Sequence, residues 1–219
     1  MTKGEKTRER IFEAALARFS QQGFAETTMR QIAQDADCSL GLAYRYFESK
    51  DAMALALYER MVAEFEEEVN NLPSGPLASR WAQAERADLT RLTPYRGTLV
   101  GLTSAGLLPG SKTQVLGEAA APLRRRMLGI FEKIVTGAKD APKASTHGPL
   151  TSMFYATHLL VILFWLQDPT PEQKTTWKLL DFGEEILGKL KLILRLPWTG
   201  ALLTRAGDLL GPLFTGTDE

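Results

Sequence analysis

Apolar residues recur along this chain at intervals of three and four, and no long stretch alternates with a period of two. Such spacing places apolar side chains on one face of a helix, so the pattern predicts an all-α fold. The first helix is expected over about residues 6–22, where Ile11, Ala15 and Phe19 share a face. Gly23 tolerates a left-handed C-cap conformation and is expected to end this helix.

Polar residues with capping chemistry mark the next three helix starts. Thr28 and Gln31 have the spacing of a capping box, which predicts a short second helix. Ser39 opens the segment SLGLAYRYFESK and is expected to cap a short third helix. Ser49 is expected to cap a long fourth helix over about residues 50–70 in the same way.

The rest of the chain reads as a further series of helices. Their expected ranges, separated by breaks rich in Pro and Gly, are 77–92, 94–108, 111–137, 150–167 and 171–196. Pro122 is expected to kink the third of these or to start its main part. A Thr-Pro-Glu-Gln capping box at residues 170–173 is expected to open the last one, and residues 197–200 to end it. A short amphipathic helix at about residues 199–214 then follows.

A helical wheel of residues 40–47 separates an inner face from an outer one. Ala43 and Phe47 fall together on the inner face. The outer face is made of four residues, namely Gly41, Leu42, Tyr44 and Arg45. Short helices joined by a tight turn form a helix-turn-helix, whose second helix enters the DNA major groove. The same shape also occurs in proteins that bind no DNA, so a helical interaction or ligand-binding protein stays the alternative.

The outer residues have chemical uses against a DNA duplex. Gly41 lets the helix backbone approach closely, and Leu40 and Leu42 offer apolar contact to thymine methyl groups. Arg45 can reach a phosphate or a guanine edge. Phosphate contacts are expected from three further residues, namely Thr28, Tyr44 and Lys50.

Residues 8–53 resemble the DNA-binding domain of the tetracycline-repressor-like (TetR) family of bacterial regulators. The motifs appear in the family's order: I-x-x-A-A-x-x-x-F, G-F, T-x-x-x-I-A and Y-x-Y-F-x-S-K. The resemblance implies a three-helix DNA-binding domain at residues 1–49. It also implies a larger helical ligand-binding and dimerisation domain at residues 50–219, to which the helix at about 199–214 is an addition.

The resemblance also implies roles for single residues. Thr28, Tyr44 and Lys50 stand at family phosphate contacts, and Arg30 stands at a position that can reach a base edge. Base reading is implied for the start of the third helix, namely Ser39, Leu40, Gly41 and Leu42. Leu42 replaces a frequent threonine, so the operator sequence does not follow from relatives.

Composition and charge exclude only a few classes of protein and partner. The chain has 26 basic and 26 acidic residues, so its net charge of zero argues neither for nor against a nucleic-acid partner. The single cysteine, Cys38, excludes an internal disulfide and is expected to be a small buried residue in a reducing, cytoplasmic setting. The 2 histidines and the cysteine lie far apart in sequence, so no enzyme, metal or cofactor is expected.

A homodimer is expected because one recognition helix covers only a few base pairs. Residues 150–167 and 171–196 have more apolar surface than a core can use, and they supply the expected interface: Phe154, Val161, Trp165, Trp177, Ile186 and Leu190. The apolar run 153–166 is shorter than the roughly 20 residues that a bilayer needs, so a buried helix is expected there instead of a membrane span.

The other helices of the larger domain are expected to enclose a pocket for a small, largely apolar molecule. The candidates are polar or aromatic residues on apolar faces: Trp81, Tyr95, Thr103, Phe131, Tyr155 and His158. Each of them is more often ordinary core than a ligand contact. A charged ligand would need a buried partner, for which Glu85 or Arg96 could serve. The whole reading predicts a ligand-responsive repressor that binds a palindromic DNA operator as a dimer and is released by a small molecule.

Overall fold

The computed structural model describes residues 1–107, 117–190 and 197–215, and these residues form helices and turns without any strand. The all-α prediction is therefore confirmed. The chain divides into two compact units. Unit 1 comprises Met1–Met61 and Leu92–Ala120, and unit 2 comprises Val62–Arg91 and Ala121–Glu219. These units divide the fourth helix internally, whereas the expected functional boundary after residue 49 stays a prediction.

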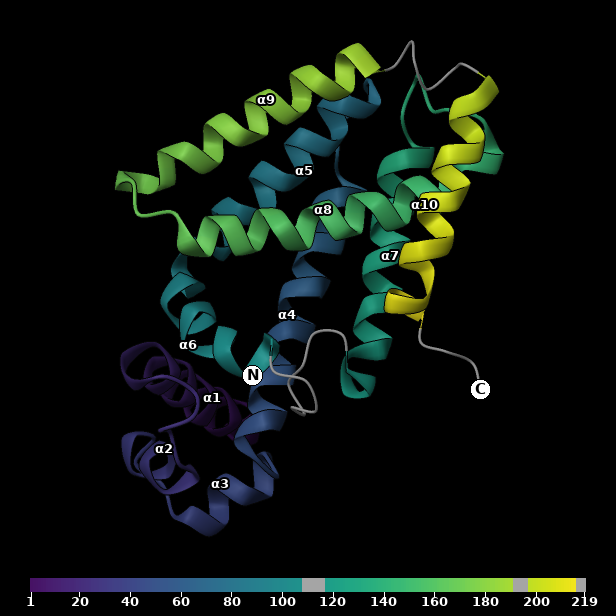
Figure 1. Cartoon of the computed structure of the whole chain (residues 1–219). Coiled ribbons are helices and arrows are strands. Elements are labelled where there is room, and N and C mark those ends of the chain that lie inside the picture. The colour runs from purple at the N-terminus through teal and green to yellow at the C-terminus, as the bar shows by residue number, and fades with distance from the viewer. Residues whose placement is uncertain (108–116, 191–196, 216–219) are drawn as a thin grey trace. The chain divides into compact units, whose positions relative to one another are not determined.

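Unit 1 contains the helices of the expected DNA-binding domain and one helix from later in the chain (Figure 1). In chain order they are α1 (Lys3–Gln22), α2 (Met29–Asp35), α3 (Leu40–Tyr46), the first part of α4 (Lys50–Asn70), the 3₁₀ turn η1 (Thr93–Tyr95) and α6 (Arg96–Leu107). Their core is apolar and almost fully shielded from water, with Ile11, Phe12, Phe19, Ile32 and Leu57 among its members. Burial of these side chains is the main stabilising contribution to the unit.

The ends of α1 show how local chemistry sets helix length. Thr2 and Glu5 form a reciprocal capping box, so α1 begins three residues before the expected start at residue 6. Gly23 ends the helix and donates its N–H to the carbonyl of Phe19, as expected of a C-cap. Its φ is 84°, but its ψ of 164° is extended, so the expected left-handed helical conformation is not adopted.

Helices α1 and α6 touch through their backbones within unit 1. A Cβ atom on Gly101 would lie 2.0 Å from the carbonyl oxygen of Phe19, so only glycine fits this position. The Gly101 carbonyl accepts the N–H of Phe24 at 3.1 Å, and the Thr98 hydroxyl donates to the Leu16 carbonyl at 3.1 Å. These contacts hold α6 directly against the end of α1.

Unit 2 is built from the remainder of α4 and from five further helices. They are α5 (Leu77–Leu92), α7 (Ala121–Thr136), α8 (His147–Gln167), α9 (Lys174–Leu190) and α10 (Pro197–Thr215). Three-residue 3₁₀ turns precede α7, α8 and α9, at η2 (Glu118–Ala120), η3 (Ala144–Thr146) and η4 (Pro171–Gln173). The bounds of α4 and α5 match the expected ones. Helix α7 starts just before Pro122, in agreement with the second of the two expectations for that proline.

The capping box expected at residues 170–173 is wrong. These residues form the turn η4, in which Glu172 and Gln173 have φ values of 57° and 52°, and α9 begins only at Lys174. The Thr170 hydroxyl donates to the carboxylate of Asp168 instead of capping Gln173. The same hydroxyl accepts the N–H of Thr175 at 3.2 Å, whereas the N–H of Gln173 donates to the Thr170 carbonyl at 2.9 Å.

Asp168 is the residue that organises the α8–α9 connection. Its carboxylate accepts the N–H and hydroxyl of Thr170 and the N–H and hydroxyl of Thr176, at 2.7–2.9 Å. Burial acts to raise the pKa of Asp168, but these hydrogen bonds outweigh it and hold the pKa well below its usual range. The α9 start is therefore fixed by a buried aspartate.

Residues 197–200 were expected to end the preceding helix. They form the start of α10 instead, which begins at Pro197. Figure 1 shows α10 beside α7, and it also packs against α8. Leu203 and Phe214 provide its buried contacts, and the Phe214 ring lies 4.8 Å from that of Tyr155. The extra C-terminal helix thus packs against the larger domain. The expected helical residues 111–116 and 191–196 lie outside the described residues.

Within the described residues, one helical stretch, Ala144–Gln167, is long and apolar enough to cross a membrane. Part of its surface is buried against α7 and α10, and Phe154, Tyr155 and Trp165 are almost fully shielded inside unit 2. This packing is typical of a core helix in a folded domain.

Candidate nucleic-acid interface

The turn between α2 and α3 is tight and hydrogen-bonded. Asp37 adopts a φ of 45°, a conformation that aspartate tolerates better than most residues. The N–H of Cys38 donates to the Ala33 carbonyl at 3.0 Å, and the Ser39 hydroxyl accepts the N–H of Leu42 at 3.1 Å. Ser39 is thus the expected cap of α3. Cys38 itself is partly exposed, so its expected full burial is wrong.

The inner face of α3 is the one that the helical wheel predicts. Ala43 is fully buried, and Phe47 directly after the helix is 4% exposed. The Phe47 ring stacks on Phe12 of α1 with centroids 5.8 Å apart, and the guanidinium of Arg8 lies 4.6 Å from the Phe47 ring centroid. These contacts anchor α3 to α1 and fix which of its faces remains outside.

The outer face of α3 and the start of α2 carry the residues expected to contact DNA. Six of these residues are exposed, namely Thr28, Arg30, Ser39, Gly41, Tyr44 and Arg45. Leu40 and Leu42 are half-buried, so part of each side chain is available. A Cβ atom on Gly41 would meet nothing within 4 Å, so no neighbouring protein group covers this point of the helix.

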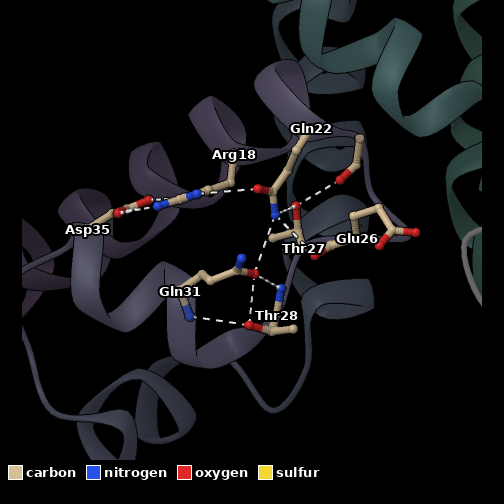
Figure 2. Close-up of polar contacts among 8 residues, drawn as sticks. Arg18, Gln22, Glu26, Thr27, Thr28, Gln31 and Asp35 are labelled. Atoms are coloured by element: carbon tan, nitrogen blue, oxygen red, sulfur yellow. Dashed lines mark hydrogen bonds and ion pairs between the residues drawn. The ribbon is translucent and has the colours of Figure 1, made fainter.

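Thr28 begins α2 as expected. Its hydroxyl accepts the N–H of Gln31 at 3.3 Å, and the Gln31 side-chain oxygen accepts the Thr28 N–H at 2.8 Å. The predicted capping box is therefore present, and Figure 2 shows it at the end of a longer chain of polar contacts.

This chain of polar contacts joins α1 to α2 (Figure 2). The guanidinium of Arg18 forms a two-bond ion pair with Asp35, one of the bonds measuring 2.8 Å. Arg18 also donates to Gln22, whose amide nitrogen donates to the Glu26 carbonyl and to Gln31. The ion pair holds the pKa of Asp35 below its usual range. Sequence reasoning missed Arg18 and Asp35 because residues 17 positions apart give no local spacing signal.

Lys50 has a role that differs from the expected phosphate clamp. Its ammonium donates to the carbonyls of Phe24, Ala25 and Thr27 at 2.6, 3.0 and 3.0 Å. It also lies 4.5 Å from the centroid of the Phe24 ring. An ammonium has three hydrogens, and all three have backbone acceptors here. Lys50 therefore holds the α1–α2 connection, which favours a positioning role for it over the expected phosphate contact.

The residues expected to line a ligand pocket are divided between the two units. Trp81, Phe131, Tyr155 and His158 are buried in unit 2, whereas Tyr95 and Thr103 belong to unit 1 and are partly exposed. Arg96, considered as a partner for a charged ligand, also belongs to unit 1. Four of the six expected pocket residues therefore belong to unit 2.

One of these four, His158, belongs to a buried ionic cluster with Glu85, Asp88, Arg91 and Glu64. Nδ1 of His158 lies 3.0 Å from the carboxylate of Glu85, and Nε2 lies 3.9 Å from that of Asp88. Arg91 pairs with Asp88 and, at 2.8 Å, with Glu64. Burial acts to lower the pKa of His158, but the charge and hydrogen bond of Glu85, helped by Asp88, raise it overall. The two carboxylates therefore favour the protonated form of His158.

Half of the expected dimer residues are unavailable to a partner. Phe154, Val161 and Trp165 are at most 5% exposed and belong to the core of unit 2. Trp177 and Leu190 are partly exposed, and Ile186 is exposed. A different apolar set faces outward on α8 and α9, namely Leu160, Leu163, Phe164, Leu179, Phe182 and Ile186. The sequence could not choose between them, because α8 is apolar on every side.

Comparisons with known proteins agree with this geometry. Residues 11–57 match the family of bacterial regulatory proteins, tetR family. The transcriptional regulator HbdR of Aromatoleum sp. (strain CIB) is 38% identical over 65 residues, which cover 30% of this chain and 28% of HbdR. The probable acrEF/envCD operon repressor of Escherichia coli (strain K12) is 43% identical over 51 residues, covering 22% of this chain and 23% of the repressor. The chain thus spans about a quarter of the length of these two curated relatives.

Solved structures extend the likeness of the fold to most of the chain. A tetR-family transcriptional regulator from Streptomyces coelicolor superposes with a TM-score of 0.64 at 21% identity, covering 97% of both chains. NalD of Pseudomonas aeruginosa, a repressor of a multidrug efflux pump, gives 0.60 at 20% identity, covering 83% of this chain and 96% of NalD. FadR of Thermus thermophilus, solved with lauroyl-CoA, gives 0.57 at 24% identity, covering 84% and 93%.

The fold and the exposed face of α3 define a helical protein with a helix-turn-helix DNA-binding domain. Residues 11–57 match the DNA-binding domain of the tetR family of bacterial regulatory proteins, and the fold of the chain is similar to that of TetR-family regulators.

Proposed function

We propose that this protein is a cytoplasmic, ligand-responsive transcriptional repressor. The observation that carries the proposal is the outer face of α3, where Ser39, Gly41, Tyr44 and Arg45 are exposed while Ala43 and Phe47 anchor the helix. A short helix held in this way presents its N-terminal residues to base edges in the major groove.

The proposed DNA contacts divide into positioning and reading. We assign phosphate contacts to Thr28, Tyr44 and Arg45, and a base-edge contact to Arg30. Leu40 and Leu42 would add apolar contact to thymine methyl groups from the start of α3. Lys50 contributes by holding the α1–α2 connection from which Thr28 extends.

A homodimer on a palindromic operator follows from the size of the reading element. One α3 helix covers only a few base pairs, so two copies related by a two-fold axis would read two half-sites. The outward apolar residues of α8 and α9 support this, since a soluble monomer rarely keeps such a group uncovered.

Release by a small molecule is proposed for unit 2. Support comes from the fold shared with NalD, a repressor of an efflux pump, and with FadR, solved with lauroyl-CoA. The ligand and the operator would be coupled if they favour different arrangements of the dimer.

Selection of bound fragments from random and genomic DNA by the purified full chain tests the proposal. We expect a palindromic motif with two half-sites about one helical turn apart, bound at nanomolar concentration. Binding that ignores DNA sequence, or no binding at all, would favour the alternative of a helical interaction or ligand-binding protein.

A further inference from the structure

The ionic cluster of unit 2 is unusual because its charged side chains are almost fully buried. Glu85 is 0% exposed, Asp88 2% and His158 5%. Carboxylates are almost never buried to this degree unless they are paired, and buried charges that a fold retains are often functional. The cluster joins α5, which carries Glu85 and Asp88, to α8, which carries His158.

The pairing in this cluster leaves one position unfilled. One oxygen of Glu85 binds His158, whereas the other, Oε1, is buried and has no hydrogen-bond donor within the described residues. Asp88, in contrast, is paired with Arg91. An ionised carboxylate can only accept hydrogen bonds, so the unfilled position at Glu85 calls for a donor.

A second buried polar atom lies on the same face of α5. Trp81 stands one helical turn before Glu85, is 3% exposed, and its indole N–H has no acceptor within the described residues. The Trp81 ring stacks on Phe154 at 6.4 Å. Two polar atoms without hydrogen-bond partners in the described part of the chain thus lie on adjacent turns of one buried helix face. Buried polar groups are normally hydrogen-bonded, so this pair of atoms calls for an explanation.

Aromatic rings pack around His158 in unit 2. His158 is stacked on Phe65 with centroids 5.5 Å apart and touches Phe131 at 5.2 Å. Tyr155, on the same helix as His158, lies beside Phe131 at 6.0 Å. Such rings favour an apolar ligand body, and their faces attract a cationic group.

We propose that Glu85 Oε1 is the recognition point for the regulatory ligand, and that this ligand is an apolar molecule with a protonated amine. The proposal rests on the proposed function, since it assigns a chemical class to the small molecule that acts on unit 2. An amine supplies the missing donor with a charge-assisted bond to the carboxylate. A hydroxyl would supply a weaker donor, and a carboxylate or phosphate would meet Glu85 as a like charge.

The expected order of affinity is amine, then alcohol, then acid. It is tested with three probes that each carry a phenyl ring on a short alkyl chain: 4-phenylbutylamine, 4-phenylbutan-1-ol and 4-phenylbutyrate. Binding to the full chain is measured by titration calorimetry and by the shift in melting temperature. We expect the amine to bind at least tenfold more tightly than the alcohol, and the acid to give no shift. An acid that binds as tightly as the amine, or a series in which no probe binds, would overturn the proposal.

The variant Glu85→Gln tests the residue. We expect it to weaken amine binding at least tenfold while changing alcohol binding less than threefold. The matched control is Glu68→Gln, an exposed carboxylate on α4 of the same unit, which should leave all three probes unchanged. Equal binding of the amine by Glu85→Gln and the wild type would contradict the proposal. If Glu85→Gln does not fold, the probe ordering in the wild-type chain still decides.

DNA binding of the probe-free protein is measured separately, so that the two proposals fail independently. A chain that binds no DNA but selects the amine through Glu85 would contradict the proposed repressor function and support the proposed ligand site. A chain that binds DNA but does not bind the amine would contradict the ligand site and support the DNA-binding function.

Discussion

Single residues in this protein carry roles that their positions in a motif do not reveal. Lys50 ends the motif Y-x-Y-F-x-S-K, yet its ammonium bonds three carbonyls of the α1–α2 connection. His158 looks like an isolated histidine in the sequence, yet it is paired with Glu85 deep inside unit 2, and this carboxylate acts to raise its pKa. In both cases the partner lies more than twenty residues away along the chain.

Lys50→Met keeps the apolar stem of the side chain and removes its ammonium. We expect the free energy of unfolding to fall by roughly 1.5–3 kcal/mol, as for the loss of hydrogen bonds from a charged group. DNA affinity should fall as well, but the slope of log affinity against log salt should stay unchanged, because no phosphate contact is lost. Urea unfolding and binding titrations at several salt concentrations measure both effects.

Arg45→Met is the control for that experiment, because Arg45 is exposed on the outer face of α3. For Arg45→Met, the slope of log affinity against log salt should fall in magnitude by about one, as expected for one lost phosphate contact. A similar fall with Lys50→Met would mean that the ammonium leaves its carbonyls to bind DNA, and our assignment would be wrong.

His158 should make stability depend on pH. Its pKa in the folded state is raised above the unfolded value of about 6.5, so the stabilisation is complete below pH 6.5. It is then lost as pH rises through the folded pKa. The charged groups that face His158 are Glu85 and Asp88, with Arg91 beyond them. Urea midpoints between pH 5.5 and 9 should therefore decline for the wild type.

His158→Gln should flatten this decline, because the variant has no proton to lose there. The chain has only one other histidine, His147, so His147→Gln is the matched control and should keep the wild-type profile. Identical profiles for wild type and His158→Gln would disprove the charged pairing.

Elements in this fold are joined where small residues allow close approach. Helix α6 meets α1 at Gly101, whose missing side chain leaves room for the Phe19 carbonyl. Helix α9 meets α5 at Gly183, where a Cβ atom would lie 2.7 Å from the Trp81 ring. Glycine within a helix costs backbone entropy, so its presence at these two contacts marks a packing requirement.

Gly101→Ala should destabilise unit 1. The added Cβ would overlap a backbone oxygen, which cannot rotate away, so we expect a loss of about 1–3 kcal/mol in the free energy of unfolding. Gly129→Ala on α7 is the control, since nothing lies within 4 Å of its Cβ position. The control should gain about 0.5–1 kcal/mol from improved helix propensity. Urea unfolding distinguishes the two, and a Gly101→Ala protein as stable as wild type would refute the contact.

At the scale of the whole molecule, the exposed apolar residues of α8 and α9 are the basis of the proposed dimer. Leu160 and Phe182 are 66% and 58% exposed, and neither has a structural reason to be apolar in a monomer. The same residues carry the proposal that two copies read two DNA half-sites.

Phe182→Glu should therefore break the dimer, because a charge would be buried at the interface without a partner. We expect sedimentation at micromolar concentration to change from dimer to monomer, with DNA affinity falling at least a hundredfold. Leu209→Glu on α10 is the control, since Leu209 is 72% exposed but lies outside α8 and α9. A wild-type chain that is monomeric would contradict the assignment, as would a Phe182→Glu dimer.

The sequence alone determined the features that depend on contacts within one or two helical turns. Capping residues located the starts of α2, α3 and α4, and apolar spacing identified the inner face of α3. The motifs of residues 8–53 then indicated a DNA-binding domain of the TetR kind, and residues 11–57 match that family's model. These signals are local, so they can be read without knowing how the chain folds back on itself.

The tertiary structure alone decided which apolar and charged residues meet. Helix α8 is apolar on every side, so only its packing against α7 and α10 shows that Trp165 is inside and Leu160 is outside. The expected capping box at residues 170–173 is replaced by a turn, in which the buried carboxylate of Asp168 accepts the N–H groups and hydroxyls of Thr170 and Thr176. Glu85 and His158 lie 73 residues apart, and no local pattern predicts an ion pair that forms only when two distant helices pack.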